Sequence, residues 1–318
     1  MINNYNKYID QSTDLVTTHE QTRAGFLSIA LEKNMVSDPF VKNALVFKSM
    51  VKDVAKPEDL IKIKDVRPFL VTASGLSDKS LNYLSDDDQT MAIQELIDKF
   101  LKPAGNEFID EAIFRYLIIK GDAVGGRMRN RIGALGEEKL LRCLISCMDV
   151  KGISFDWLPK DNGKTWIHNN NDAGIEKNIK SIHWFAAGKH RVFGLNLNIP
   201  IVKKNVDLCI FNSTIEAYSN GAIVKEPEKI IMLGELKGGI DPAGADEHWK
   251  TANTALTRIR NSFQNSGLDI KTSFVGAAIA NAMAGEIFMQ LEENILSNAA
   301  NLTNRDQLVE YCNWILTL

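Results

Sequence analysis

The sequence predicts an α/β protein with a mixed central β-sheet flanked by helices, preceded by an all-helical region. Two patterns lead to this fold class. Apolar residues recur at helical spacing through most of the first 120 residues, whereas strand-like segments begin only near Ile153. Beyond Ile153 the strands are interleaved with helices and followed by them, as expected when helices pack on a sheet. We therefore expect a helical domain at residues 1–120 and an α/β domain at residues 121–318.

The helical region contains four predicted helices. They cover Thr18–Asn34, a segment from Pro39 to Val54, Ser85–Leu101 and Asn106–Lys120. The third begins with three aspartates, which suit a helix N-terminus because its free N–H groups carry partial positive charge. Gly121–Gly126 contains three glycines and predicts a hinge or tight turn, after which a long helix is expected over Arg127–Met148.

The second region alternates strands and helices. Strands are predicted at Ile153–Leu158, Ile182–Phe185, Val192–Val202, Val206–Phe211, Ile230–Lys237 and Thr272–Ala280, with turns at Gly163 and Gly188. Helices are predicted at Asp246–Phe263, Ala282–Leu291 and Asp306–Leu316. The loop Asn212–Glu228 is long for a hairpin, and such loops often pack against a partner or a substrate.

Composition restricts the class of protein. A content of 45% hydrophobic and 24% charged residues is typical of a soluble globular protein. The longest apolar runs, such as Phe274–Ala280, are too short to span a membrane, and the N-terminus has no secretory apolar segment. We therefore expect a cytoplasmic protein without membrane contact.

The net charge of −3 argues against indiscriminate nucleic-acid binding, but a locally basic groove would be compatible with it. Seven Lys and Arg residues stand against three acids in the segment Arg115–Arg142. Further basic residues lie at Lys203-Lys204 and around Lys250. Each group can be an ordinary solvated face. Together they predict a phosphate-contacting surface, for which Arg127, Lys204 and Lys250 are the candidates.

The four cysteines, Cys143, Cys147, Cys209 and Cys312, form no CxxC unit. Cys143 and Cys147 are four residues apart on one helix face and could contribute to a zinc site. With no second pair nearby in the sequence, we expect buried, reduced thiols instead.

The chemistry of the chain is concentrated in two neighbouring strands. Asp207 lies in one of them, and Glu235-Leu236-Lys237 ends the next. Side chains two apart in a strand share a face and lie about 7 Å apart. If the strands pair, two carboxylates and an ammonium meet at one spot. Hard oxygen ligands suit Mg²⁺, and a lysine can orient a metal-bound water or stabilise charge on a phosphate. This pattern indicates a metal-dependent phosphodiester hydrolase.

An acid-x-Lys tripeptide is short, and the chain has others. Glu137-Glu138-Lys139 lies in a predicted helix, where residues two apart point to different sides. Asp269-Ile270-Lys271 lies on a turn. Only Glu235 and Lys237 end a hydrophobic strand that follows a second strand bearing an acid. A surface ion pair on an edge strand would account for the same residues, so the pattern alone leaves both interpretations open.

Longer stretches carry a resemblance. They are Val202–Asp207 and Leu233–Asn261, together with Arg23–Phe26, Ala30–Asn34, Ala73–Gly75, Pro103–Gly105 and Asn298–Thr303. In these stretches the chain resembles the BsoBI/AvaI family of type II restriction endonucleases, in the PD-(D/E)xK superfamily. The resemblance extends over nearly the whole chain and implies a restriction-endonuclease-like core.

The resemblance also implies a function. Members of the family cut double-stranded DNA at the degenerate site C-Y-C-G-R-G, use Mg²⁺ and leave 5′ overhangs. They act as homodimers whose helical and catalytic regions together enclose the duplex. A cognate DNA methyltransferase is then expected as a functional partner that does not bind the enzyme.

Site residues follow from the same resemblance. Asp207, Glu235 and Lys237 fall on metal and catalytic positions, with the Leu236 carbonyl as a further metal ligand. His248 falls on a histidine expected to activate the water.

Lys79 and Asp241 fall on positions implicated in base reading. Lys79 can donate to a purine N7 and Asp241 can accept from the cytosine N4 amine. Without the resemblance, Lys79 is a solvated helix residue and Asp241 a turn former. Glu137 or Glu138 either adds a carboxylate to the metal site or lies on a solvated helix face. Segments 160–180 and 212–226 differ from the family pattern, and we assign them no role.

Two other functions remain open at this point. The first is a structure-specific repair or recombination nuclease on the same core, which the large helical region argues against. The second is a sequence-specific DNA-binding protein that does not cleave and whose acids are structural. Such a protein would bind duplex DNA equally well in Mg²⁺ or in a chelator.

Overall fold

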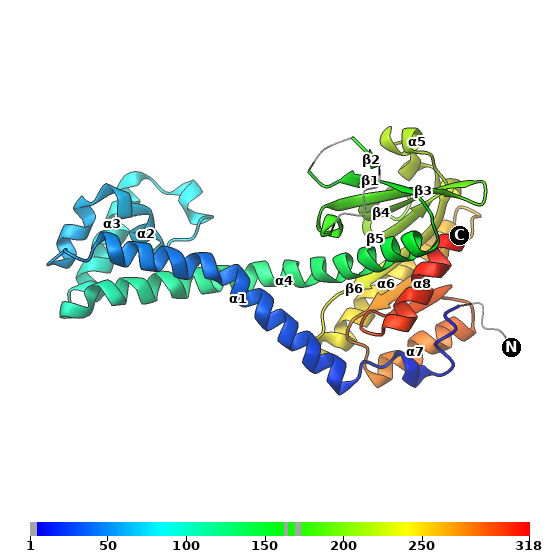
Figure 1. Cartoon of the computed structure of the whole chain (residues 1–318), viewed down its shortest axis with the longest axis horizontal. Helices are drawn as coiled ribbons and strands as arrows, with labels where there is room; N and C mark the ends of the chain where they lie inside the picture. The colour runs from blue at the N-terminus through cyan, green and yellow to red at the C-terminus, as the bar shows by residue number, and fades with distance from the viewer. Residues whose placement is uncertain (1–4, 162–164, 169–172) are drawn as a thin grey trace. The chain divides into compact units, whose positions relative to one another are not determined.

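The structure is a computed structural model that describes residues 5–161, 165–168 and 173–318 (Figure 1). It divides into two compact units, one formed by Leu27–Arg131 and the other by residues up to Phe26 together with Ile132–Leu318. Two long helices, α1 (His19–Met50) and α4 (Phe108–Val150), contribute residues to both units. The predicted division at residue 120 falls inside α4. The assignment of DNA enclosure and catalysis to separate domains stays a prediction.

The unit Leu27–Arg131 is helical, as predicted. Besides parts of α1 and α4 it contains α2 (Arg67–Ala73), α3 (Asp86–Leu96), a π-helical turn η5 (Ile97–Leu101) and the short 3₁₀ helices η2 (Pro57–Lys62), η3 (Lys64–Val66), η4 (Ser80–Tyr83) and η6 (Gly105–Glu107). Its core includes a stack of aromatic rings in which Phe69 lies between Phe47 and Tyr116, with centroids 3.9 Å apart on each side. The predicted acidic start of α3 is present, because Ser85 and Asp88 cap that helix reciprocally.

Two predicted breaks in the helices are wrong. The helix α1 continues through Pro39, although proline inside a helix removes a hydrogen bond and costs about 3 kcal/mol. Ala44 and Phe47 follow Pro39 and are buried in the core, so packing stabilises the helix beyond the proline. The three glycines of Gly121–Gly126 form neither hinge nor turn but lie within α4. Each costs about 1 kcal/mol relative to alanine, which lowers helix propensity without ending the helix.

The other unit contains one mixed sheet with the strand order β2-β1-β3-β4-β5-β6-β7-β8. The strands are β1 (Phe155–Pro159), β2 (Ile167–His168), β3 (Ile179–Ala186), β4 (Lys189–Ile199), β5 (Lys204–Phe211), β6 (Ile230–Lys237), β7 (Lys271–Gly276) and β8 (Asn298–Asn301). Pairing is antiparallel from β2 to β6 and parallel from β6 to β8. The predicted α/β fold with a mixed sheet is therefore confirmed.

Some details of the sheet differ from the prediction. The strand expected to reach Ala280 ends at Gly276, after which the Ala277 N–H donates to the Lys237 carbonyl at 2.9 Å. β8 was not expected, because its sequence Asn-Ala-Ala-Asn has little strand propensity. Gly188 forms the predicted turn with a φ of 76°, and the predicted turn at Gly163 lies outside the described residues.

Helices cover both faces of the sheet. They are α5 (Ile215–Ser219), α6 (Ala245–Gln264), α7 (Asn281–Glu292) and α8 (Arg305–Thr317), together with the C-terminal part of α4. The apolar face of α6 packs with Leu233 of β6 and Phe274 of β7 in one core. On the opposite face, the Ser273 hydroxyl hydrogen-bonds to the Tyr311 hydroxyl of α8 at 2.8 Å.

The loop expected over Asn212–Glu228 contains α5 and two 3₁₀ helices, and its Tyr218 and Ile223 are buried against the sheet. Across the described ranges, no helix is both long and apolar enough to cross a membrane.

Candidate active site

The pairing of β5 with β6 brings the two acidic strands together. In their antiparallel register Leu208 lies opposite Gly234, so Asp207 and Glu235 are the next residues along. Both strands are largely buried, and β6 ends at Lys237. Asp207, Glu235 and Lys237 all point to the face of the sheet that α6 covers, since Leu233 and Phe274 lie on that face.

The three side chains meet in one cluster. The Lys237 Nζ lies 2.7 Å from Glu235 Oε2 and 3.1 Å from Asp207 Oδ2. The Leu236 backbone N–H also donates to Asp207 Oδ2, at 2.9 Å. The Glu235 side chain is only 6% exposed, whereas those of Asp207 and Lys237 are 29% and 23% exposed. Within the cluster, Glu235 is therefore buried, whereas Asp207 and Lys237 are accessible to solvent.

The electrostatics of this cluster favour a bound cation. Burial, together with the nearby Asp207 carboxylate, raises the pKa of Glu235 to about 7. Burial works to lower the pKa of Lys237, but the Asp207 and Glu235 carboxylates outweigh it and the pKa is raised. Two ionised carboxylates and one ammonium leave a net negative charge. A divalent cation would lower the cost of keeping both carboxylates ionised.

The donor set fits a hard cation such as Mg²⁺. Asp207 and Glu235 offer carboxylate oxygens, and no third His, Cys, Asp or Glu completes a compact ligand group with them in the described ranges. Mg²⁺ commonly takes one or two carboxylates and completes its shell with water and phosphate oxygens. Glu137 accepts a hydrogen bond from Asn196 at 2.6 Å and lies 3.7 Å from Lys160 Nζ, so its carboxylate is engaged by other side chains.

His248 lies in the first turn of α6, as predicted, and is half-buried. Its ring packs against the glycines that follow Lys237, because a Cβ atom built on Gly239 would lie 2.9 Å from His248 Cε1. Its Nδ1 is buried and has no hydrogen-bond partner in the part of the chain that the structure describes. The ring is therefore held by contact with glycine backbone, and Nδ1 is a buried nitrogen that the described residues leave without a hydrogen bond.

The predicted base-reading residues lie in different units. Lys79 is exposed at the start of η4 in the unit Leu27–Arg131. Asp241 is exposed in the other unit, and its side chain accepts a hydrogen bond from the Ala243 N–H at 3.0 Å. Asp241 therefore acts as a turn former before Pro242, and among the described residues its second carboxylate oxygen takes part in no hydrogen bond or ion pair.

The predicted phosphate-contacting residues are all at the surface. Lys204 is the exposed first residue of β5, and Lys250 pairs with Asp246 one helical turn away at 2.5 Å. Arg127 lies 3.8 Å from Asp78. These solvated pairs are weak, so they would exchange readily for phosphate oxygens.

One feature of the site was not predicted. Gly136 of α4 lies directly against Gly238, the residue after Lys237. Gly238-Gly239 directly follows Lys237 in the sequence, but the sequence does not indicate which element packs there.

The comparisons with known proteins identify the family of the chain. The family model for "Restriction endonuclease BsobI" matches residues 5–318. The chain is 48% identical over 317 residues to the type II restriction enzyme BsoBI of Geobacillus stearothermophilus, covering 99% of this chain and 98% of that protein. It is 45% identical over 315 residues to the type II restriction enzymes AvaI of Nostoc sp. and Anabaena variabilis, covering 99% of each chain. The protein belongs to the BsoBI family of restriction endonucleases.

Proposed function

We propose that this protein is a type II restriction endonuclease that hydrolyses both strands of duplex DNA at the degenerate palindrome C-Y-C-G-R-G, leaving 5′ overhangs, and that it requires Mg²⁺. The observation that carries the proposal is the cluster of Asp207, Glu235 and Lys237 at the accessible end of β6. The family also supports the proposal, because relatives of this chain are named as type II restriction enzymes.

Asp207 and Glu235, with the Leu236 carbonyl, would hold the metal ion. When bound, the ion would supply positive charge to the scissile phosphate and lower the pKa of a water molecule. Burial disfavours the ionised form of Glu235, and a bound cation would stabilise that ionised carboxylate.

Lys237 is proposed to act on the phosphate or on the attacking water. Its ammonium already contacts both carboxylates, which fix its position at the edge of the cluster. A fixed ammonium can stabilise charge that develops on a phosphate oxygen without rearranging. His248 is proposed as the base that takes a proton from the water, and the placement of its half-buried ring in the first turn of α6, against the glycine that follows Gly238, supports that role.

A palindromic site requires two equivalent catalytic centres. We infer that the protein acts as a homodimer, in which a two-fold axis places one Asp207–Glu235–Lys237 cluster on each strand. Lys79 and Asp241 would read base edges, while Arg127, Lys204 and Lys250 would contact phosphates. We place the enzyme in the cytoplasm, with a cognate DNA methyltransferase as its functional partner.

The proposal is tested by digesting a sequenced plasmid with the purified protein and mapping the ends. We expect discrete fragments with 5′ extensions at every C-Y-C-G-R-G site in Mg²⁺ and none in chelator. Cleavage confined to branched or damaged DNA would indicate a repair or recombination nuclease instead. Binding that is equal in Mg²⁺ and chelator, with no nicking, would indicate a DNA-binding protein without catalytic function.

A further inference from the structure

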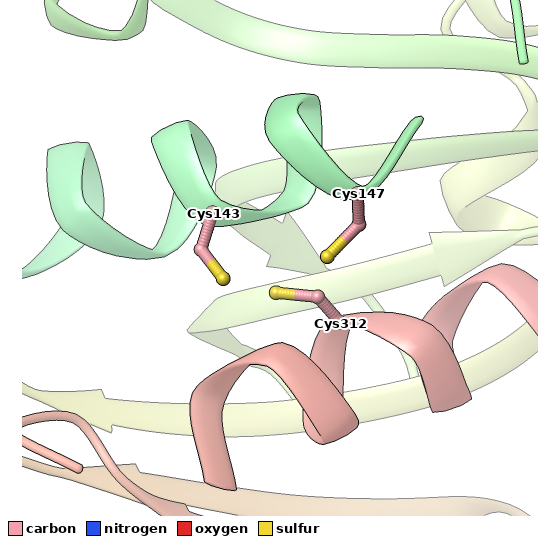
Figure 2. A group of neighbouring side chains, drawn as sticks. All are labelled: Cys143, Cys147 and Cys312. Atoms are coloured by element: carbon pink, nitrogen blue, oxygen red, sulfur yellow. The ribbon is translucent and has the colours of Figure 1, made fainter. Parts of the chain in front are cut away.

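Three cysteine side chains meet on the face of the sheet that α8 covers. Cys143 and Cys147 come from the C-terminal part of α4 and Cys312 from α8, all in the unit that contains the sheet. Their sulfur atoms lie within 4.8 Å of one another. Figure 2 shows the three thiols pointing toward a common centre. Cys143 and Cys147 were recognised in the sequence as a possible half of a zinc site, but Cys312 is far away in the chain and was not connected to them.

The burial of the three thiols differs. Cys312 is fully buried, Cys147 is 8% exposed and Cys143 is half-buried. All three are free thiols. An ion could therefore enter past Cys143 and would be enclosed by the other two. This is also the one cluster of three potential ligating side chains found in the described residues.

The donor chemistry selects the kind of ion. The cluster offers three sulfur atoms and neither carboxylate nor imidazole, so it is soft and suits Zn²⁺ or a similar thiophilic ion rather than Mg²⁺. The catalytic cluster offers oxygen atoms and has the opposite preference. The two sites would thus take different ions from the same solution.

Two basic side chains lie near the sulfur cluster. Arg305 lies close enough to Cys143 for its charge to act on that thiol, and Lys151 does so for Cys147. Three thiolates around a divalent ion carry one net negative charge, which these cations would balance.

We propose that Cys143, Cys147 and Cys312 form a binding site for a thiophilic divalent ion of the zinc class. Binding converts each coordinating thiol to a thiolate and releases its proton to solvent, with no change of oxidation state. The ion would join the C-terminal part of α4 to α8, which is itself hydrogen-bonded to β7 through Tyr311 and Ser273. Gly136, which packs against the end of β6, is also part of α4. The ion would therefore hold this helix in place on the sheet.

The test is a titration of the full-length, reduced protein with Cd²⁺ under anaerobic conditions. Sulfur-to-cadmium charge transfer absorbs in the ultraviolet, whereas carboxylate ligands give no such band. We expect saturation at one Cd²⁺ per chain, displacement by Zn²⁺ and no displacement by Mg²⁺. Cys143→Ser should weaken Cd²⁺ binding by about 100-fold or more, since losing even an outer-shell partner of a metal ligand costs about 10–100-fold.

Matched variants separate this site from the rest of the molecule. Cys209→Ala removes the one cysteine outside the cluster, and Asp207→Asn disables the proposed Mg²⁺ site. Both should keep the charge-transfer band. Cys143 is half-buried, so its variant is expected to fold, and Zn²⁺ should raise the Tm of the wild type and of Asp207→Asn but not of Cys143→Ser. Absence of the band in the wild type, or an unchanged band in Cys143→Ser, would mean that the three residues are ordinary buried thiols.

Discussion

Gly136 and Gly238 touch through their backbones. A Cβ atom on Gly136 would lie 2.8 Å from the Cα of Gly238, and a Cβ on Gly238 would lie 2.9 Å from the Ile132 carbonyl oxygen. Real Cβ atoms do not approach backbone so closely, so the contact requires glycine at both positions. Since Gly238 follows Lys237 directly, α4 fixes the point at which the chain leaves the candidate catalytic strand.

Gly136→Ala should therefore destabilise the protein, because its methyl group would force α4 and the end of β6 apart. We expect a loss of about 1–3 kcal/mol in the free energy of unfolding, as for other overpacked positions, together with slower DNA cleavage. Urea denaturation and a plasmid cleavage assay measure the two effects.

Gly133→Ala is the matched control. It lies one turn earlier on the same helix, and a Cβ there would meet no atom of another described segment within 4 Å. Replacing a helical glycine in open space should stabilise the protein by about 0.5–1 kcal/mol. Equal effects of the two substitutions would show that the Gly136–Gly238 contact is not tight in solution.

Asp207→Asn, Glu235→Gln and Lys237→Ala should each abolish Mg²⁺-dependent cleavage and leave specific DNA binding largely intact. The reason is that all three are proposed to act on the scissile phosphate and not on bases. Binding is measured in Ca²⁺ or chelator and cleavage in Mg²⁺. Asp269→Asn is the control, because Asp269 also precedes a lysine by two residues but is exposed before β7. Near wild-type cleavage by any of the three variants would exclude that residue from catalysis.

The pKa of Glu235 predicts how stability depends on pH when chelator keeps metal away. This pKa is raised from 4.5 to about 7 in the folded chain, so between these values the folded state holds a proton that the unfolded state has lost. Stability should accordingly fall as pH rises through this window. Glu235→Gln cannot ionise and should therefore lack this decrease in stability. At pH 8 the variant should be more stable than wild type by on the order of 1–3 kcal/mol, since one pKa unit corresponds to about 1.4 kcal/mol.

Thermal unfolding at pH 5 and pH 8 measures this difference. The gap between the two proteins should be small at pH 5, and at pH 8 added Mg²⁺ should stabilise the wild type more than the variant. A gap that is the same at both pH values would mean that Glu235 ionises normally.

The parts of the site that could be predicted are those with local patterns. Asp207, Glu235 and Lys237 lie in buried segments with strand-like composition, so the period of two and the strand order were enough to bring them together. The contact of Gly136 with Gly238 and the meeting of Cys312 with Cys143 depend on how helices pack on the sheet. No local pattern encodes such packing.

The difference between local pattern and packing also explains where the predicted fold is wrong. Pro39 and the glycines of Gly121–Gly126 weaken helices locally, yet both helices continue through them. Packing outweighs propensity at Pro39, because Phe47 is buried in the core beyond it. Strand β8 is the converse case, since its polar sequence becomes a strand through pairing with β7.

Lys79→Ala should reduce discrimination at one purine position of the recognition site by about 1–3 kcal/mol, because its proposed contact is to a purine N7. Affinities for the cognate duplex and for single-mismatch duplexes measure this. Lys204→Ala is the comparison, because a phosphate contact is lost equally from every sequence and reduces the salt dependence of binding. If Lys79→Ala also weakened all duplexes equally, Lys79 would be a phosphate contact.

His248→Ala should slow single-turnover cleavage by about 100-fold or more at saturating Mg²⁺ while preserving DNA binding. This expectation rests on the placement of the ring, which packs against Gly239, two residues after Lys237. Its Nδ1 is buried and has no hydrogen-bond partner among the described residues. His248→Gln is included because it retains hydrogen-bonding atoms and fills much of the space, yet cannot act as a base near neutral pH. If the glutamine variant were as slow as the alanine variant and both folded normally, loss of packing could not account for the effect. His19→Ala, at an exposed helix start, is the control for histidine removal. A His248→Ala protein that cleaves within about tenfold of wild type would show that the water is activated without it, leaving Lys237 and the metal for that task.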